Sequence, residues 1–472
     1  MIPKICLTIP INREKITNMN YQNLELRITN RKLQMNVISH CSLVISLFSL
    51  LVAFYSPLVA SDQTPGKKQE KPIALIGGTI HTVSGKVIHN GILAFSNGKI
   101  EIVSDATPLP PKYERIDITG KNVYPGMFNA GTTLGMIEIG AVRATRDVNE
   151  VGRMNPNVRA EITLNPDNEQ IPVTRANGIT TSLIFPGGGI ISGLAAIIHL
   201  DGWTYEEMTM KSRTALVLNW PSMRMSSSRF ERRTEEEQKK EREKILKEIR
   251  ETFNDAKAYW IAKNANKISK RDVRWEAMVP VLEKKTPILI TADEMLQIEA
   301  AVAFAMEMNL QMILYGGTDA WRVAELLKQH AVPVILNGTQ NLPTRNWDAY
   351  DEPYVLPKKL ADAGVKYCIA VNEVGNGDDR NLPYNASQAV AYGLSKEEAL
   401  KAITLYPAQI FGVENRIGSL EVGNDATLIV TNGDVLDIRS NVEMEFIEGK
   451  KVDLSSRHTM LWEKYKKKYG KK

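Results

Sequence analysis

Cysteine and histidine are scarce in this chain of 472 residues, which has three cysteines and six histidines. Cys6 and Cys41 belong to a leader that we expect to be removed, and Cys368 by itself cannot form an intramolecular disulfide. Hydrophobic residues make up 43% of the chain, so a large domain can bury a core without disulfide cross-links.

A basic surface suited to nucleic acid is also missing, although the formal net charge is +5. The first 60 residues hold six Lys or Arg against two acids, which leaves 53 basic and 52 acidic residues in the rest. The last sixteen residues carry Arg457 and six lysines against Glu463 alone, so the part between is mildly acidic. We expect no nucleic-acid partner. The Lys-rich tail, residues 453–472, is expected to be solvated, and contact with acidic lipid is the alternative.

Residues 1–60 have the features of a targeting leader. Arg31 and Lys32 precede a mostly apolar run at 37–59, and small Ala60 follows it. We predict a signal peptide, with translation starting at Met35 and an exported, periplasmic or extracellular product. The alternative is an uncleaved membrane anchor, because the run is long enough to span a bilayer. Polar residues 61–72 are expected to form a linker.

Two β-rich pieces lie at the ends of the remaining chain. Residues 73–122 contain short apolar runs separated by Gly-Gly, Ser-Gly, Asn-Gly and Thr-Gly pairs, and residues 417–452 repeat that pattern. They most simply pair into one composite β-domain, with residues 123–416 inserted as a second domain.

The inserted stretch alternates strand-like and helix-like segments, which favours βα units and a parallel sheet. Its apolar runs have the length of strands buried on both faces. These runs are NVYPGMFNA, GITTSLIFP, TALVLNW, PILIT, QMILYGG, VPVILNG and VKYCIAV. Seven or eight such units close into an α/β barrel of the TIM (β/α)₈ type.

Two motifs carry a family resemblance. Residues 123–135, VYPGMFNAGTTLG, look like the first barrel strand of the amidohydrolase superfamily. The C-terminal stretch LYPAQIFGVENRIGSLEVGNDATLIV is similar to the return from barrel to β-domain in the imidazolonepropionase-like and dihydroorotase-like branches. The resemblance covers residues 73–452. It implies a (β/α)₈ barrel with a small β-sandwich domain built from both ends of the mature chain.

The resemblance also implies a metal centre, with zinc or another divalent cation that activates water. In the family, histidines after strands one, five and six and an acid after strand eight hold the metal, together with a Lys or Glu after strand four. The resemblance places Asn129 where the first strand of the family has an Asp. It places Gly131, Thr133, Thr291 and Gly316 at the histidine positions, and Asn372 or Glu373 at the acid after strand eight. Glycine has no side chain and threonine is a poor zinc ligand, so we expect no metal and no other cofactor.

The histidines supply no obvious replacement, because only His199, at the end of LAAIIH, is expected to approach the barrel mouth. Glu373, with Asn372, is the candidate catalytic group, since it follows the last strand and has no helix to cap. Asp293 and Asp319 are expected to cap the helices that follow them.

Three functions remain open. The resemblance implies a hydrolase of non-peptide carbon–nitrogen bonds, here with an altered or metal-free site. A catalytically silent subunit that pairs with an active paralogue is the second hypothesis, and an exported small-molecule binding protein is the third. The expected partners are a small-molecule ligand or substrate and other subunits, in a homo-oligomer or a heteromer.

Overall fold

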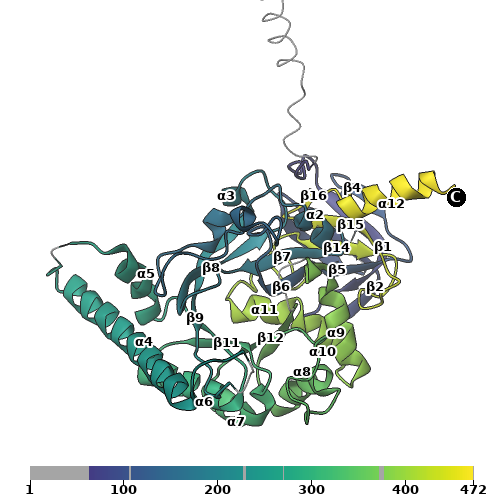
Figure 1. Cartoon of the computed structure of the whole chain (residues 1–472). Helices are drawn as coiled ribbons and strands as arrows, with labels where there is room; N and C mark the ends of the chain where they lie inside the picture. The colour runs from purple at the N-terminus through teal and green to yellow at the C-terminus, as the bar shows by residue number, and fades with distance from the viewer. Residues whose placement is uncertain (1–62, 106–107, 227–229, 269, 372–376, 471–472) are drawn as a thin grey trace, which may run out of the picture. The chain divides into compact units, whose positions relative to one another are not determined.

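The computed structural model describes residues 63–105, 108–226, 230–268, 270–371 and 377–470. Residues 63–472 form one compact unit, shown in Figure 1. Among the described residues, the four buried apolar clusters all lie in this unit, so it holds its own core. The leader 1–60 and the positions Asn372 and Glu373 lie outside the described residues.

One sheet joins strands from both ends of the unit. Its order is β16-β15-β14-β5-β1-β2-β3, and β4 pairs with β1. The link between the two ends is β5, which pairs in parallel with β1 and antiparallel with β14. The strands are β1 (Ile73–His81), β2 (Val87–Ser96), β3 (Lys99–Ser104), β4 (Glu114–Asp117), β5 (Asn122–Pro125), β14 (Leu428–Thr431), β15 (Val442–Ile447) and β16 (Lys450–Lys451).

The second sheet has eight strands that neighbour one another in chain order, from β6 to β13. They are β6 (Met127–Thr132), β7 (Ile179–Ile184), β8 (Ile191–His199), β9 (Thr209–Asn219), β10 (Ile288–Ala292), β11 (Met312–Gly316), β12 (Val334–Asn337) and β13 (Tyr367–Ala370). β6 also lies against β13, so the sheet is nearly closed. The predicted fold class, a TIM-type barrel with a β-domain from both ends, is confirmed.

One strand departs from the all-parallel barrel. β8 runs antiparallel to both β7 and β9. Only residues 185–190 connect β7 to β8. A parallel crossover needs a dozen or more residues, so this glycine-rich connection turns the chain back as a hairpin.

The predicted strand NVYPGMFNA is two strands in two sheets. β5 ends at Pro125 and β6 begins at Met127, so Gly126 is the point where the chain passes from the β-domain to the barrel. A Cβ on Gly126 would lie 2.1 Å from Oγ1 of Thr180, so glycine allows this close approach.

Helices make up most of the remaining elements. They are α2 (Gln170–Arg175), α3 (Tyr205–Met208), α4 (Glu235–Asn264), α5 (Val273–Leu282), α6 (Met295–Glu307), α7 (Ala324–Gln329), α8 (Glu352–Ala363), α9 (Leu382–Ala391), α10 (Lys396–Ala402) and α11 (Leu405–Ile410), followed by α12 (Arg457–Lys468). Short 3-10 turns are η1 (Arg143–Thr145), η2 (Ala160–Thr163), η3 (Ala320–Val323) and η4 (Asp378–Asn381). The long charged α4 packs on α6 through Phe253 and Phe304. Among the described residues, no helix is both long and apolar enough to cross a membrane.

The barrel interior is an apolar core. The side chains that its strands direct inward are buried, and they include Phe128, Leu183, Val217, Leu289, Ile313, Ile335 and Cys368. The interior is therefore packed, and a ligand site of such a barrel forms at the carboxyl ends of its strands.

Candidate functional site at the barrel mouth

A cavity of about 310 Å³ lies where β10, β11 and β12 end. This volume is at the lower end of the range for small-molecule sites. Its polar lining includes Asp293, Thr318, Asn337, Asn341, Thr344 and Glu352. Larger cavities lie beside α4 and between β1, β5 and α10. We take the smaller one as the candidate site, because active sites of such barrels form at the carboxyl ends of the strands.

The ring of Tyr315 fills the place where a side chain at position 131 would be. A Cβ on Gly131 would lie 2.4 Å from Cε2 of Tyr315. β6 and β11 are not neighbours in the sheet, so this contact crosses the barrel interior. Tyr315 also meets Phe185 edge to face at 5.1 Å, and its hydroxyl donates to Oδ1 of Asn337 at 3.2 Å. Tyr315 thus separates the apolar interior from the mouth.

Asn129 joins the first and last strands of the barrel. Its Nδ2 donates to Oδ1 of Asp379 at 2.6 Å, and its Oδ1 accepts from the backbone N–H of Val371 at 3.2 Å. Asn129 and Asp379 are both fully buried. The side chain of Asn129 therefore links β6 to the end of β13 and to η4.

Asp293 and Asp319 at the mouth each accept hydrogen bonds from the loop that carries the other, and not from the first backbone N–H groups of the helix that follows in the chain. Oδ1 of Asp293 accepts from the hydroxyl and the N–H of Thr318, at 2.9 and 3.4 Å, in the turn before η3. Oδ2 of Asp319 accepts from the N–H of Met295, which begins α6, at 3.1 Å. The expectation that each caps its own helix is wrong, because β10 and β11 are adjacent and parallel, so their loops meet.

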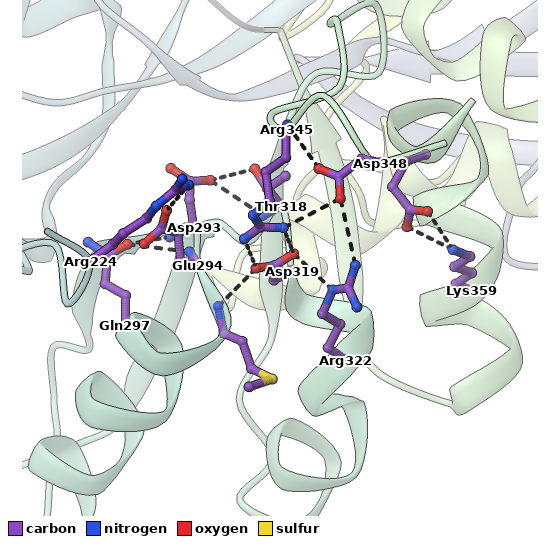
Figure 2. A network of polar contacts seen from close by, with 12 residues as sticks. Arg224, Asp293, Glu294, Gln297, Thr318, Asp319, Arg322, Arg345, Asp348 and Lys359 are labelled. Carbon is purple, nitrogen blue, oxygen red and sulfur yellow. Dashed lines mark hydrogen bonds and ion pairs between the residues drawn. The ribbon is translucent and has the colours of Figure 1, made fainter. Parts of the chain in front are cut away.

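Asp319 is also the centre of an ion network, which Figure 2 shows from close by. Arg345 donates to both of its carboxylate oxygens, and Nε of Arg322 donates to Oδ1 at 3.1 Å. The backbone N–H of Arg345 donates to Asp348 at 3.0 Å. Burial alone would raise the pKa of Asp319, but the bonds from Arg345 and Met295 hold that pKa below its ordinary value. The network fixes the loop after β12 to the mouth.

The described residues do not fit the family's metal centre. Gly131 and Gly316 offer no donor, and a Cβ on Gly316 would lie 2.7 Å from Oδ1 of Asp293. Thr291 pairs with Tyr315 in the sheet. Within the described ranges, no group of three or more His, Cys, Asp or Glu is placed to hold a metal ion. Imidazoles and carboxylates gathered round one point are what such a centre requires.

His199 lies at the opposite end of the barrel from the mouth, so the expectation that it approaches the mouth is wrong. It ends β8, which runs against its neighbours, and it pairs with Thr181 near the start of β7. Its Nδ1 is 3.3 Å from Oγ1 of Thr181, and burial lowers its pKa. The direction of one strand therefore decides where this histidine lies.

The structure places three of the predicted site positions beside residues outside the predicted set or at the end of a strand. Gly131 meets Tyr315, and Gly316 meets Asp293, while Thr133 directly follows β6. The candidate catalytic residues Asn372 and Glu373 lie outside the described residues. Sequence reasoning missed Tyr315 and Arg345. The signal for Tyr315 was a polar aromatic residue at the end of an otherwise apolar strand.

Comparison with known proteins supports this architecture. An amidohydrolase from Thermotoga maritima MSB8 has 26% sequence identity and a TM-score of 0.72, over 81% of this chain and 99% of that one. The amidohydrolase tasK of Hapsidospora irregularis is 22% identical over 427 residues, 82% of this chain and 42% of that protein. The imidazolonepropionase of Bacteroides thetaiotaomicron is 33% identical over 88 residues, 18% of this chain and 21% of that protein. The chain thus spans less than half the length of these two relatives.

A sequence profile of the amidohydrolase family matches residues 204–452, more than half of the chain. That region runs from before β9 to the end of the composite β-domain, and so includes the strands that bound the mouth cavity. By this match and by its barrel with a composite β-domain, the chain belongs to the amidohydrolase family.

Proposed function

We propose that this chain binds a polar small molecule at the barrel mouth and does not use the metal-bound hydroxide of its family. Membership of the amidohydrolase family supports a hydrolase-like function, and as part of the proposal the ligand carries an amide or another carbon–nitrogen bond. The observation that carries the proposal is the ring of Tyr315 in the space beside Gly131. An imidazole at position 131 has no room there.

The lining of the cavity supports the choice of ligand. Asp293 accepts hydrogen bonds, the amides of Asn337 and Asn341 both donate and accept, and the hydroxyls of Thr318 and Thr344 do the same. Such groups recognise an amide or a lactam through paired donors and acceptors. Without an activated water, a bound amide would stay unhydrolysed, because unassisted water is a weak nucleophile.

Metal analysis tests the first half of the proposal. We expect residues 63–472, purified without chelator, to hold less than about a tenth of an equivalent of zinc, manganese or iron by inductively coupled plasma mass spectrometry. About one or two equivalents would contradict the proposal, because residues outside the described ranges would then complete a metal centre.

A thermal-shift screen with cyclic amides and dipeptides tests the second half. A ligand at a hundred times its Kd stabilises the folded chain by about 2.7 kcal/mol, which is an easily measured shift. Asp293→Asn should abolish that shift, and Asp362→Asn, at an exposed carboxylate on α8, is the matched control. Chromatography of the same mixtures measures turnover, and metal-dependent product formation would contradict the proposal.

A silent subunit is the second candidate function, and a surface feature favours it. The loop after β12 exposes Leu342, Trp347 and Tyr350, with 85%, 74% and 71% of their surfaces accessible. Exposed apolar side chains grouped on one loop are typical of a contact with another subunit. Co-purification with a paralogue that keeps its metal ligands, lost in Trp347→Ser, would support this role.

The leader supports a further proposal, that the protein is exported. Sequencing the N-terminus of the protein from its native host tests it. A start near residue 61 supports cleavage of a signal peptide, and a start at or before Met35 supports an anchor.

A further inference from the structure

The Lys-rich C-terminal segment contains a helix, α12, over Arg457–Lys468. Its beginning is fixed by a capping box, in which Ser456 accepts from the N–H of Thr459 and Thr459 accepts from the N–H of Ser456. Nδ1 of His458 lies 3.0 Å from Arg380, and α12 adjoins α2. Figure 1 shows α12 in yellow, leading to the labelled C-terminus. The segment expected to be solvated is therefore an ordered element attached by its first turn.

One side of α12 carries an exposed apolar and aromatic stripe. At about 100° per residue, Leu461, Trp462, Tyr465 and Tyr469 fall within an arc of about 100°. Their exposed fractions are 38%, 63%, 46% and 66%. None of the residues of α12 is buried, so no part of the described chain covers this stripe.

Lysines border the stripe on both sides. By the same rotation, Lys464 and Lys468 lie beside Leu461, and Lys466 lies beside Trp462. Nζ of Lys468 is 5.9 Å from the ring centre of Tyr465 and 5.3 Å from that of Tyr469. Glu463 is the sole acid between Arg457 and Lys472. The helix is thus both amphipathic and strongly basic.

More lysines lie on the strand from which α12 follows. β16 consists of Lys450 and Lys451, and it ends five residues before the N-cap of α12. A Cβ on Gly66 would lie 2.9 Å from the carbonyl oxygen of Lys451, so the segment from Gly66 runs beside β16. That segment adds the exposed residues Lys67, Lys68 and Lys71 against Glu70. Gln63 and Arg175 of α2 line one small cavity, so α12 and residues 63–71 border the same helix.

We propose that α12 and these lysines form a docking surface for an anionic phospholipid bilayer. A basic helix with Trp, Tyr and Leu on one side lies in the membrane interface, with its apolar side among the headgroups. Trp and Tyr favour that depth because their rings are apolar and their N–H and O–H groups stay hydrated. Twelve residues are too short to cross a bilayer, so α12 lies on the surface.

The lysines that border the stripe favour a membrane over a protein partner. A purely apolar protein groove would use the stripe alone and would leave the lysines around it without a partner. An anionic bilayer uses both parts, since each lysine near its surface adds attraction that salt screens. The two parts of the surface therefore give separate experimental signatures.

Vesicle co-sedimentation of residues 63–472 tests the proposal. The unit holds its own core, and leaving out residues 1–62 removes the other apolar segment. We expect at least tenfold tighter binding to vesicles of phosphatidylglycerol and phosphatidylcholine than to phosphatidylcholine alone, and weakening as salt rises. Replacing Trp462, Tyr465 and Tyr469 by Ser should reduce binding roughly tenfold or more.

Matched control variants test whether a loss of vesicle binding is specific to α12. Trp347→Ser removes a tryptophan elsewhere that is more exposed than Trp462, and it should leave binding unchanged. Changing Lys464, Lys466 and Lys468 to Gln should weaken binding, whereas changing Lys240, Lys244 and Lys247 of α4 to Gln should not. Equal binding of the wild type and the stripe variant, or no binding of the wild type to anionic vesicles, would overturn the proposal. A wild-type dimer that the stripe variant loses in light scattering would instead assign α12 to a second copy.

Discussion

At the scale of single residues, two glycines and a tyrosine shape the mouth. Gly131 and Gly316 leave space that the ring of Tyr315 and the carboxylate of Asp293 fill. Two of the positions that the family resemblance assigns to metal ligands are thus packed by other side chains of this chain. Packing of this density makes each position sensitive to the addition of one methyl group.

Gly131→Ala tests this packing. We expect a loss of about 1–3 kcal/mol in the free energy of unfolding, because the new Cβ overlaps the Tyr315 ring. Tyr315→Ala should relieve that overlap, so the double variant should lose less than the two single losses added together, as measured by urea unfolding. Strict additivity would show that the two residues do not touch.

Glu445 on β15 should make stability fall as pH rises. It is fully buried, and within the described residues its carboxylate has no hydrogen-bond partner. Burial raises its pKa well above 4.5, while Arg175 opposes that rise. The folded state therefore keeps a proton that the unfolded state releases above pH 4.5, and stability declines from there through the raised pKa.

Glu445→Gln should remove this decline. At pH 8 we expect its Tm to exceed that of the wild type by about 1–3 °C, and near pH 4 the two should agree, because the wild-type carboxyl is then protonated. Calorimetry at both pH values measures the difference. A variant less stable than the wild type at pH 8 would mean that Glu445 is ionised and paired.

At the scale of elements, neighbouring loops hold one another in place. The acids after β10 and β11 exchange hydrogen bonds, and Arg345 ties the loop after β12 to Asp319. The lower pKa of Asp319 means that its carboxylate stabilises the folded state above pH 3.8 and ceases to do so as pH falls through the folded pKa.

Asp319→Asn should therefore cost about 1–3 kcal/mol at pH 7, because Arg322 and Arg345 lose the nearer of the two carboxylates that they share, and Asp348 remains. The difference from the wild type should shrink in acid, below pH 3.8. Denaturant unfolding measures both values, with exposed Asp362→Asn as a control that changes stability by less than about 0.5 kcal/mol. Equal stability of Asp319→Asn and the wild type at pH 7 would exclude a structural role for the network.

At the scale of the whole molecule, the closed barrel shields the thiol of Cys368. This residue is fully buried among the interior side chains, and burial raises its pKa far above the usual value. In residues 63–472 it is the sole cysteine, so its reactivity reports on the opening of the barrel.

We expect Ellman's reagent to label Cys368 no faster than the chain unfolds globally, because the thiol is reached only when the strands separate. Labelling rates across urea concentrations should follow the unfolding rates from circular dichroism. Gly131→Ala should raise both rates together. Rapid labelling of the native protein would show that the barrel opens locally beside β13.

Local pattern alone determined much of this protein. The apolar runs predicted the seven parallel barrel strands, and the turn-rich ends predicted a β-domain shared between both ends of the chain. Alternation, turn pairs and strand length depend on neighbouring residues, so the sequence displays them directly. The assignment of residues to the family's ligand positions rests on the resemblance and stays a prediction.

Tertiary structure decided what those residues meet. The sequence did not indicate that β8 runs backwards, which takes His199 to the far end of the barrel. It did not place Tyr315 against Gly131, 184 positions earlier in the chain, or turn the lysine-rich end into a helix with an aromatic side. Contacts between distant segments depend on strand direction and on the space that packing leaves, and neither property is written in any short stretch of sequence.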